Sequence, residues 1–271
     1  HFMSTDQNLV REGEGFFRLE GKFKRLGDKN DIVAKYKLRG KKVFECNKVA
    51  YKRLSDHVGH LPLVIIAPDD ARLILDGSEE RRRFLDFILV QFDNQYMNQL
   101  LRYNQIIEQR NALLKSVDHP KMIDLSLLEV YDAQLPEPAE YIHQRRIDFI
   151  KDLYPIFKGY YEEISGGKEA VEINYKSQLH DETLSVLLKN SRERDLILQR
   201  TTKGIHKDDL ILTMKGQSLK QFASQGQLKS FLLAMKLAQY ELLRQAREVT
   251  PILLLDDILK EVTANFAKSI S

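Results

Sequence analysis

Two neighbouring stretches decide the fold: SQGQLKSFLLAMKLAQYELL (residues 224–243) and PILLLDD (residues 251–257). The first is a small polar turn directly in front of a helix that is apolar on most of its faces. Ser224 and Gln227 have the S-x-x-Q spacing of a capping box, in which two side chains satisfy free backbone donors. The hydroxyl, the exposed amides and Gly226 also suit a phosphate group. The residues alone leave both interpretations open and favour the cap, because capping boxes are the more common feature.

The second stretch is a short apolar strand that ends in two carboxylates, Asp256 and Asp257. Acids at the carboxyl end of a buried strand lie where α/β sheets bind ligands. In nucleotide hydrolases this is the Walker B motif, whose first acid holds Mg²⁺ and whose second positions or activates the attacking water. Paired acids after a strand are weak evidence alone. A capped helix followed by such a strand, however, has the order of the signature and Walker B motifs in ATP-binding-cassette (ABC) proteins.

The hydrophobic period changes along the chain upstream of these stretches. Residues 15–53 alternate apolar and polar side chains and predict strands joined by turns, and residues 63–67 predict a buried strand. Residues 78–115 and 125–159 have helical spacing. The first of these begins at Ser78, its expected N-cap, and exceeds the usual length of one helix, which indicates a projecting arm or a pair of helices. The two together predict an antiparallel helical lobe.

Strand periodicity returns after the helical lobe. The Gly-Gly-Lys triplet at 166–168 predicts a hairpin turn rather than a phosphate-binding loop, because both flanks read as strands. A further helix is expected over 181–204 and a further hairpin over 204–219. The sequence therefore predicts three parts: residues 1–77, a β-rich lobe; 78–160, a helical arm; and 161–271, a return to the first lobe with the signature and Walker B motifs.

Composition limits the class of protein. The 271 residues are 43% hydrophobic and 30% charged, which indicates a globular chain with a real core. A single cysteine, Cys46, excludes an internal disulfide framework and fits a reducing compartment. No apolar run is long enough to cross a bilayer, and the first residues lack the order of a secretory signal. We expect a soluble, cytoplasmic protein with no membrane partner.

Positive charge is concentrated near the beginning of the chain. Residues 21–53 hold 12 Lys and Arg against 3 Asp and Glu, whereas the remainder holds 30 against 36. Basic and apolar residues alternate there, as in strands with one wet, positive face, which suits a phosphate backbone. A lysine-rich face kept for solubility and edge protection explains the pattern equally well. The residues that we expect to contact DNA are Lys35, Lys37, Arg39, Lys41 and Lys42.

Four stretches together resemble the RecF family of bacterial recombination mediators, ABC-type ATPase heads related to SMC proteins. They are APDDARLILDGSEERRRFLD (67–86), GIHKDDL (204–210), SQGQLKSFLLAMKLAQYELL (224–243) and PILLLDDI (251–258). The resemblance extends from His1 to Ile258. It implies an α/β (α+β) fold: an ABC-type head with a β-rich lobe and an inserted antiparallel helical lobe.

The resemblance also implies roles for particular residues. Ser224, Gln225, Gly226 and Gln227 would form the signature that contacts the γ-phosphate of ATP held by a second protomer, so the turn would be both a cap and a phosphate contact in an ATP-dependent homodimer. Asp256 would be the Mg²⁺ ligand, and Asp257 would be the catalytic carboxylate. The family binds duplex DNA near single-strand gaps, acts with RecO and RecR to load RecA, and hydrolyses ATP slowly.

Several features depart from the family pattern. No G-x-x-x-x-G-K-[ST] phosphate loop occurs in the chain; family members carry it upstream of His1, so we expect a fragment that binds ATP poorly and is inactive alone. The acid expected soon after Walker B and the family's C-terminal segment are also missing. Ile205 and Lys207 stand where the family usually has Pro and Arg. His206, between them, is expected to be structural or interfacial rather than catalytic.

Two rivals belong to other classes. One is a non-hydrolysing module, in which the head fold serves only as a docking surface for another protein. The other is a metal-dependent nuclease built around Asp69, Asp70, Asp256 and Asp257. A phosphate loop in the encoded residues before His1 would favour the ATPase, whereas the nuclease would need Mg²⁺-dependent DNA cleavage without nucleotide.

Overall fold

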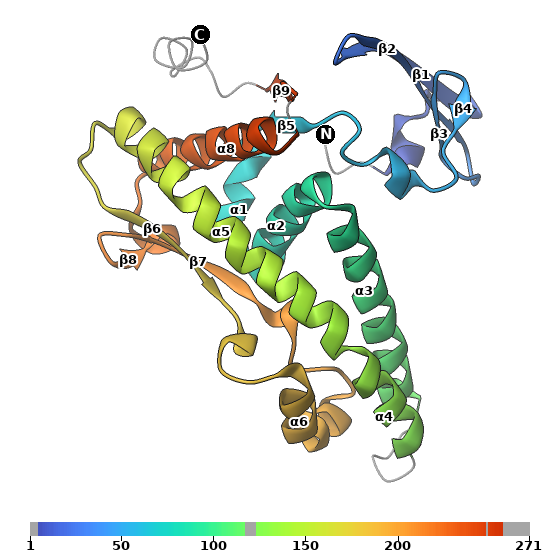
Figure 1. The fold of residues 1–271 in the computed structure, drawn as a ribbon, viewed down its shortest axis with the longest axis vertical. Helices are drawn as coiled ribbons and strands as arrows, with labels where there is room; N and C mark the ends of the chain where they lie inside the picture. Colours follow the sequence, from blue (N-terminus) through green and yellow to red (C-terminus); the bar gives the residue numbers. More distant parts are fainter. Residues whose placement is uncertain (1–4, 117–122, 248, 257–271) are drawn as a thin grey trace.

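Strands form three separate sheets in the computed structural model, which describes residues 5–116, 123–247 and 249–256 (Figure 1). The first is an antiparallel meander near the N-terminus, the second a parallel pair that joins distant parts of the sequence, and the third an antiparallel sheet. The strands are β1 (Phe16–Arg25), β2 (Asp28–Lys37), β3 (Val43–Cys46) and β4 (Val49–Ala50); β5 (Leu63–Ile66) and β9 (Ile252–Leu255); and β6 (Val171–Lys176), β7 (Asp209–Met214) and β8 (Gln217–Ser218).

One long helix, α5 (Pro136–Ser165), runs through the middle of the molecule and packs most extensively against the C-terminal helix and the helical arm (Figure 1). The remaining α-helices are α1 (Arg72–Leu75), α2 (Ser78–Phe92), α3 (Asn94–Lys115), α4 (Leu125–Gln134), α6 (Leu184–Leu198), α7 (Leu219–Phe222) and α8 (Gln225–Arg247). Short 3₁₀ turns include η2 (Leu54–His57), η3 (Pro68–Ala71) and η6 (Ile205–Lys207). Among the described residues, no helix combines the length and the apolar character that crossing a membrane requires.

The N-terminal sheet follows the predicted turns. Leu26 and Gly27 join β1 to β2, and Asn47 and Lys48 join β3 to β4, all four with positive φ as in type I′ hairpins. Pairing of residues 16–25 with 28–37 gives the sheet two unlike faces. The apolar face carries Phe17, Leu19, Phe23, Ile32 and Tyr36, and the basic face carries Arg18, Lys22, Lys24, Lys29, Lys35 and Lys37.

The long helical region that begins at residue 78 is a pair of helices. Asp93 separates α2 from α3, and its side chain caps α3 by accepting hydrogen bonds from the amides of Gln95 (2.8 Å) and Tyr96 (3.1 Å). The expected cap at the start of α2 was wrong: Gly77 is the N-cap, and Ser78 is already the first helical residue without a side-chain cap bond. Two helices in place of one bring α3 back against α5.

The Gly-Gly segment joins a helix to a strand, so the predicted hairpin was wrong. Helix α5 continues to Ser165, and Gly166 ends it in the left-handed conformation (φ 72°), which glycine adopts at little cost. Gly167 follows with φ 70°, and its amide donates to Glu162 O (2.9 Å). Helix α5 therefore crosses the expected boundary at residue 160, and the division into 1–77, 78–160 and 161–271 stays a prediction.

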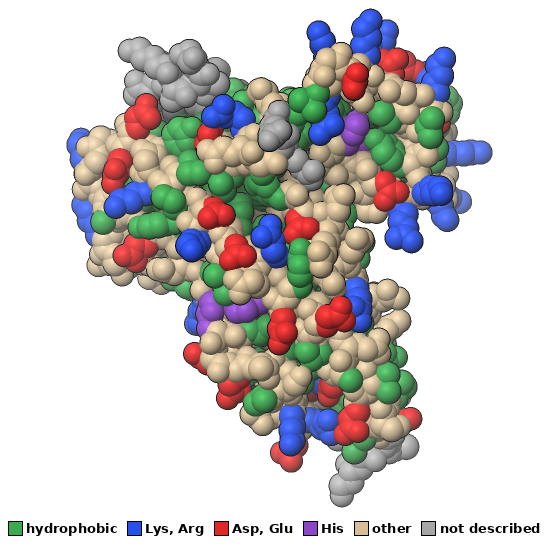
Figure 2. All heavy atoms as spheres, viewed as in Figure 1, with side chains coloured by type: hydrophobic (Ala, Val, Ile, Leu, Met, Phe, Trp, Pro, Cys, Tyr) green, Lys and Arg blue, Asp and Glu red, His purple; other side chains and the backbone are tan. Residues whose placement is uncertain are grey.

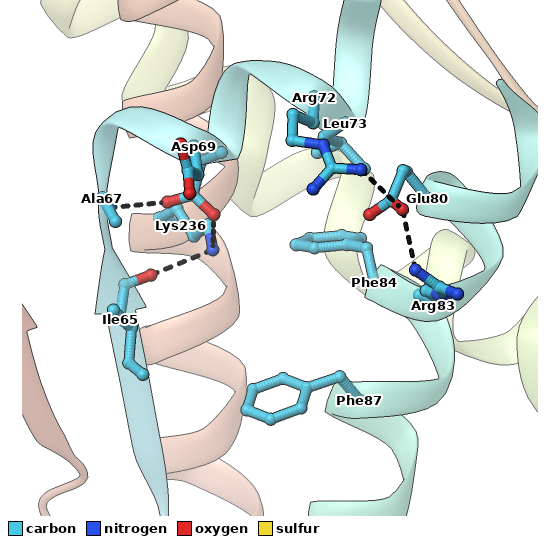
Figure 3. A pocket seen from close by; sticks show the side chains of 11 residues that line it. Ile65, Ala67, Asp69, Arg72, Leu73, Glu80, Arg83, Phe84, Phe87 and Lys236 are labelled. Carbon is cyan, nitrogen blue, oxygen red and sulfur yellow. Dashed lines mark hydrogen bonds and ion pairs between the residues drawn. The ribbon is translucent and has the colours of Figure 1, made fainter. Parts of the chain in front are cut away.

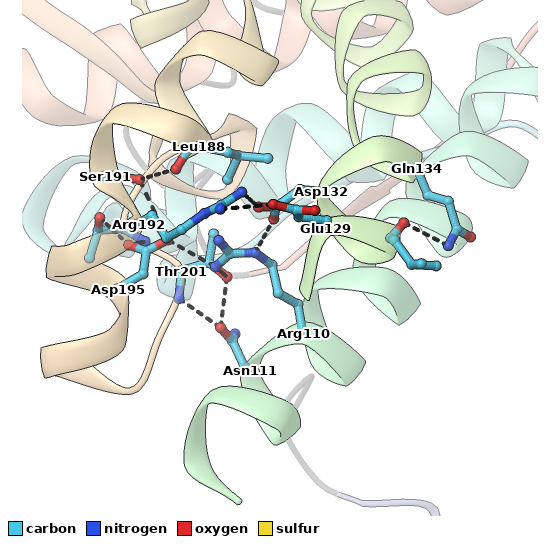
Figure 4. A network of polar contacts seen from close by, with 12 residues as sticks. Arg110, Asn111, Glu129, Asp132, Gln134, Leu188, Ser191, Arg192, Asp195 and Thr201 are labelled. Atoms are coloured by element: carbon cyan, nitrogen blue, oxygen red, sulfur yellow. Dashed lines mark hydrogen bonds and ion pairs between the residues drawn. The ribbon is translucent and has the colours of Figure 1, made fainter. Parts of the chain in front are cut away.

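A buried ion network holds the far end of the helical arm together (Figure 4). The Arg110 side chain on α3 is fully buried; its Nε donates to Asp132 Oδ1 on α4 (2.7 Å), and its Nη1 donates to Asp195 Oδ2 on α6 (2.8 Å). The same Nη1 reaches Thr201 Oγ1 (2.9 Å) in the chain that follows α6. Removing one partner of such a cluster leaves a buried charge unpaired, so the network favours the packing of α3, α4 and α6 against one another.

Candidate functional site

The turn at the start of α8 is a capping box. The Ser224 amide donates to Gln227 Oε1 (2.7 Å), and the Gln227 amide donates to Ser224 Oγ (3.3 Å). The Leu228 amide donates to Ser224 O (2.9 Å), which begins the helical ladder. The capping interpretation of S-x-x-Q is therefore confirmed.

The same turn leaves hydrogen-bond donors open. Gln225 and Gly226 occupy the first two helical positions, whose amides have no acceptor within a helix. Because Ser224 Oγ accepts from Gln227, its own hydroxyl proton can point outward. Nothing in the described chain lies within 4 Å of a Cβ added at Gly226, and the residue has no left-handed φ. The chain's own packing therefore does not require glycine at this position.

The acidic strand pairs with the buried strand predicted over 63–67. Strands β5 and β9 run parallel with Ile66 opposite Leu255, and the Asp256 amide donates to Ile66 O (2.9 Å). Asp256 is exposed at the carboxyl edge of this pair, as expected for a Walker B acid. Asp257 lies outside the described residues.

The signature turn and the carboxyl edge of β5 line one cavity. Its volume is about 440 Å³; Ile66, Ala67 and Pro68 line one side, and Gln225, Leu228 and Leu232 of α8 line the other. Leu233 and Leu237 of α8 also pack in one buried cluster with Ile66. The cavity thus links Gln225 of the turn to the end of β5, the strand that pairs with β9.

Sequence reasoning missed Lys236, which ties α8 to the acidic turn after β5 (Figure 3). Its nearly buried ammonium donates to Ile65 O (2.9 Å), pairs with Asp70 Oδ1 (2.6 Å) and lies 5.8 Å from the centre of the Phe84 ring. Asp70 Oδ2 in turn accepts the Ala67 amide (2.8 Å). The available signal was a single lysine inside the apolar run FLLAMKLA (231–238).

The acids of the nuclease alternative are not assembled in the described part of the chain. Asp69 is exposed, whereas Asp70 is already paired with Lys236. No group of three or more His, Cys, Asp or Glu side chains among residues 5–116, 123–247 and 249–256 is placed to hold a metal ion.

Asp208 of GIHKDDL belongs to a closed network where the arm joins the head. We call Asp86, Tyr96, Arg146, Tyr175 and Asp208 the junction network. Arg146 is fully buried and contacts Asp208 Oδ2 (2.9 Å), Asp86 Oδ1 (2.8 Å) and Tyr96 OH (3.1 Å). The Tyr175 hydroxyl donates to Asp208 Oδ2 (2.5 Å). Burial raises the pKa of Asp208, and the Arg146 charge opposes that rise.

His206 lies beside this network as a structural residue. Its Nε2 is 3.1 Å from Thr201 O and must donate there, so its Nδ1 accepts from the Tyr103 hydroxyl (2.8 Å). Burial lowers the pKa of His206 to about 4, which keeps the ring neutral. The expectation that His206 is not catalytic agrees with these inward contacts.

The five candidate DNA-contacting residues differ in their surroundings. Lys35 pairs with Glu45 (2.5 Å), and Lys42 pairs with Asp6 (2.5 Å). Lys37, Arg39 and Lys41 are exposed, and no ion pair to them is found among the described residues. Figure 2 shows basic side chains projecting from the part of the surface formed by β1–β4.

These features define an α/β ATPase head of the ABC type: a parallel strand pair ends in an exposed acid, and the helix that precedes the second strand has an open amino end. No model of a protein family matches the chain. It is 41% identical over 253 residues to the DNA replication and repair protein RecF of Flavobacterium johnsoniae, covering 93% of this chain and 70% of that protein. The chain belongs to the RecF family.

Further comparisons agree with this assignment. The chain is 40% identical over 270 residues to the RecF protein of Parabacteroides distasonis, covering all of this chain and 73% of that protein. The solved structure of the recombination mediator protein RecF with ATP, in the RecFOR pathway, superposes with a TM-score of 0.91 at 30% identity over 99% of this chain and 74% of that one. The expected head fold with its inserted helical lobe is confirmed.

Proposed function

We propose that this chain is the nucleotide-engaging head of an ATP-dependent recombination mediator that acts in DNA repair. The observation that carries the proposal is the signature turn. Its two open amides and the free hydroxyl proton of Ser224 belong to the exposed N-terminus of α8, and at Gly226 the described chain places nothing within 4 Å of an added Cβ. Three donors at a helix N-terminus suit a phosphate. Because packing within the chain does not require glycine at position 226, this residue suits the close approach of a partner's ATP.

The other residues that we propose for the nucleotide site come directly after the carboxyl end of β9. Asp256 would hold Mg²⁺, and Asp257, outside the described residues, would act as the catalytic carboxylate for slow hydrolysis. ATP would be shared in a homodimer, with its phosphates cradled by one protomer and contacted by Ser224–Gln227 of the other. The solved structure of the relative RecF with ATP supports the nucleotide in this proposal.

DNA and partner proteins complete the proposal. The basic face of β1–β4 would contact phosphates of duplex DNA near single-strand gaps. RecO and RecR would be partners in loading RecA, as the RecFOR pathway of the solved relative suggests.

The decisive experiment changes Ser224 to Asp. We use a completed protein, in which this chain is joined to the segments that its Flavobacterium johnsoniae relative carries outside the matched region. Aspartate caps a helix as well as serine, so the melting temperature should be kept. Its charge would oppose an approaching triphosphate, so ATP-dependent dimers should disappear in sedimentation velocity. Ser78→Asp, at the start of α2, is the matched control. Dimerisation of Ser224→Asp at the wild-type level would reject the signature role.

The DNA face has its own test on the chain as given. Changing Lys37, Arg39 and Lys41 to Gln should weaken duplex binding for every DNA sequence. The slope of the logarithm of the binding constant against the logarithm of the salt concentration should become shallower by about one for each lost phosphate contact. Lys35→Gln with Lys42→Gln is the control, since both lysines are already paired with acids. Unchanged affinity and salt dependence in the first set would leave these residues as solubility charges.

A further inference from the structure

The side-chain amide of Gln227, which takes part in the capping box, also has a partner far away in the sequence. Gln227 Nε2 donates to Glu169 Oε1 (3.1 Å), which lies between the Gly166–Gly167 turn and β6. Glu169 is itself held in place: its Oε2 accepts from the hydroxyl of the buried Tyr161 on α5 (3.4 Å). The Lys215 amide also donates to Ala170 O (2.8 Å), which fixes the neighbouring backbone. A carboxylate on a rigid support therefore faces the signature turn.

The two ends of a glutamine amide have opposite hydrogen-bonding properties, and Glu169 decides which end faces which partner. A carboxylate only accepts, so Nε2 must face Glu169 and Oε1 must face the Ser224 amide. In the flipped orientation two acceptors would meet at Glu169 and two donors at Ser224. Both contacts would then be repulsive. The correct orientation satisfies the Ser224 amide within the chain and leaves the outward donors of the turn open.

We propose that Glu169 is a positioning residue of the signature turn, which orients Gln227 and thereby presents the Ser224 hydroxyl and the first helical amides to a partner's ATP. The inference rests on the proposed function for its consequence, but the orientation of Gln227 rests on contacts within this chain alone. Glu169 needs no contact with nucleotide. Its effect passes through Gln227, 58 residues along the chain.

The first measurement uses the chain as given, without nucleotide. Glu169→Ala should speed hydrogen exchange of the Ser224 amide about tenfold, because a hydrogen bond held by a charged partner is lost. Glu169→Gln retains an acceptor oxygen and should stay within about twofold of wild type. Glu172→Ala on β6 is the matched control, since the hydrogen bonds of its carboxylate within the described residues go to Asn174 and Thr213.

The second measurement is ATP-dependent dimerisation of the completed protein. Glu169→Ala should weaken it about tenfold, and Glu169→Gln should restore it. Unchanged exchange or unchanged dimerisation in Glu169→Ala overturns the proposal, as does a Glu169→Gln variant that fails as fully as Glu169→Ala. A wild-type completed protein that never dimerises with ATP, together with altered exchange in Glu169→Ala, would instead reject the proposed function and leave the orientation of Gln227 standing.

Discussion

The junction network and the signature turn each contain part of a motif that resembles the RecF family: Asp208 belongs to GIHKDDL, and Ser224–Gln227 is SQGQ. Their polar groups nevertheless face opposite ways. Around Arg146 the charges are buried and paired with one another. At Ser224 the turn is exposed, and several donors are open. A buried polar group must find its partners inside the fold, whereas an exposed group can wait for a ligand. Burial therefore separates motif residues that hold the head together from motif residues that meet nucleotide.

The largest expected effect is the loss of Arg146. Arg146→Met removes the buried cation and leaves Asp86 and Asp208 without it, so the free energy of unfolding should fall by about 3–5 kcal/mol. Urea denaturation of the chain measures this change. The neighbour Arg145 is partly exposed and pairs with Asp93, so Arg145→Met should cost about 1 kcal/mol or less. Equal losses in the two variants would contradict the conclusion that the buried network around Arg146 holds the fold together more strongly than an exposed ion pair does.

A smaller effect depends on pH and comes from His206. Its pKa is lowered to about 4 in the folded chain, whereas an unfolded histidine titrates near 6.5. As pH falls from 6.5 towards 4 the unfolded state takes up the proton first, so stability present above pH 6.5 is lost, by up to about 3 kcal/mol. Unfolding free energies of wild type and His206→Gln at pH 7.5 and 4.5 test this. A wild-type loss no greater than that of the variant would exclude His206 as a cause.

The smallest expected effect is at Gly226, and there stability and function should move in opposite directions. Gly226→Ala adds a methyl group in open space on a helix, so stability should rise by up to about 1 kcal/mol. The same methyl group would obstruct a partner's phosphate, so ATP-dependent dimerisation of the completed protein should weaken. Gly159→Ala, in open space within α5, should stabilise without affecting dimers. If Gly226→Ala left dimerisation intact, an internal explanation for the glycine would have to be found.

Local chemistry could be predicted from the sequence where it depends on near neighbours. The S-x-x-Q cap, the turns of the N-terminal sheet and the apolar strand before Asp256 all matched the structure, because a few adjacent residues determine each. The break at Asp93 was foreseen only as an alternative. Its signal was an Asp-Asn pair inside a helical period that otherwise continued.

Other features could not be predicted because they depend on residues far apart. Gly166 and Gly167 looked like a hairpin turn because nothing nearby tells that α5 reaches Ser165. Lys236 pairs with Asp70 across 166 positions, and Glu169 reaches Gln227 only once α5 and α8 have packed together. The split of the basic residues into paired and open also required the positions of Asp6 and Glu45.

The contacts of Lys236 fix the position of α8 relative to β5, and this limits how the gene can change in length. Twelve helical residues, about 18 Å, separate Ser224 from the lysine that is held at Ile65 and Asp70. Inserting or deleting one residue between them would turn the signature face by about 100° relative to β5 and shift it by about 1.5 Å. Functional versions of this gene should therefore keep the length of that interval unchanged.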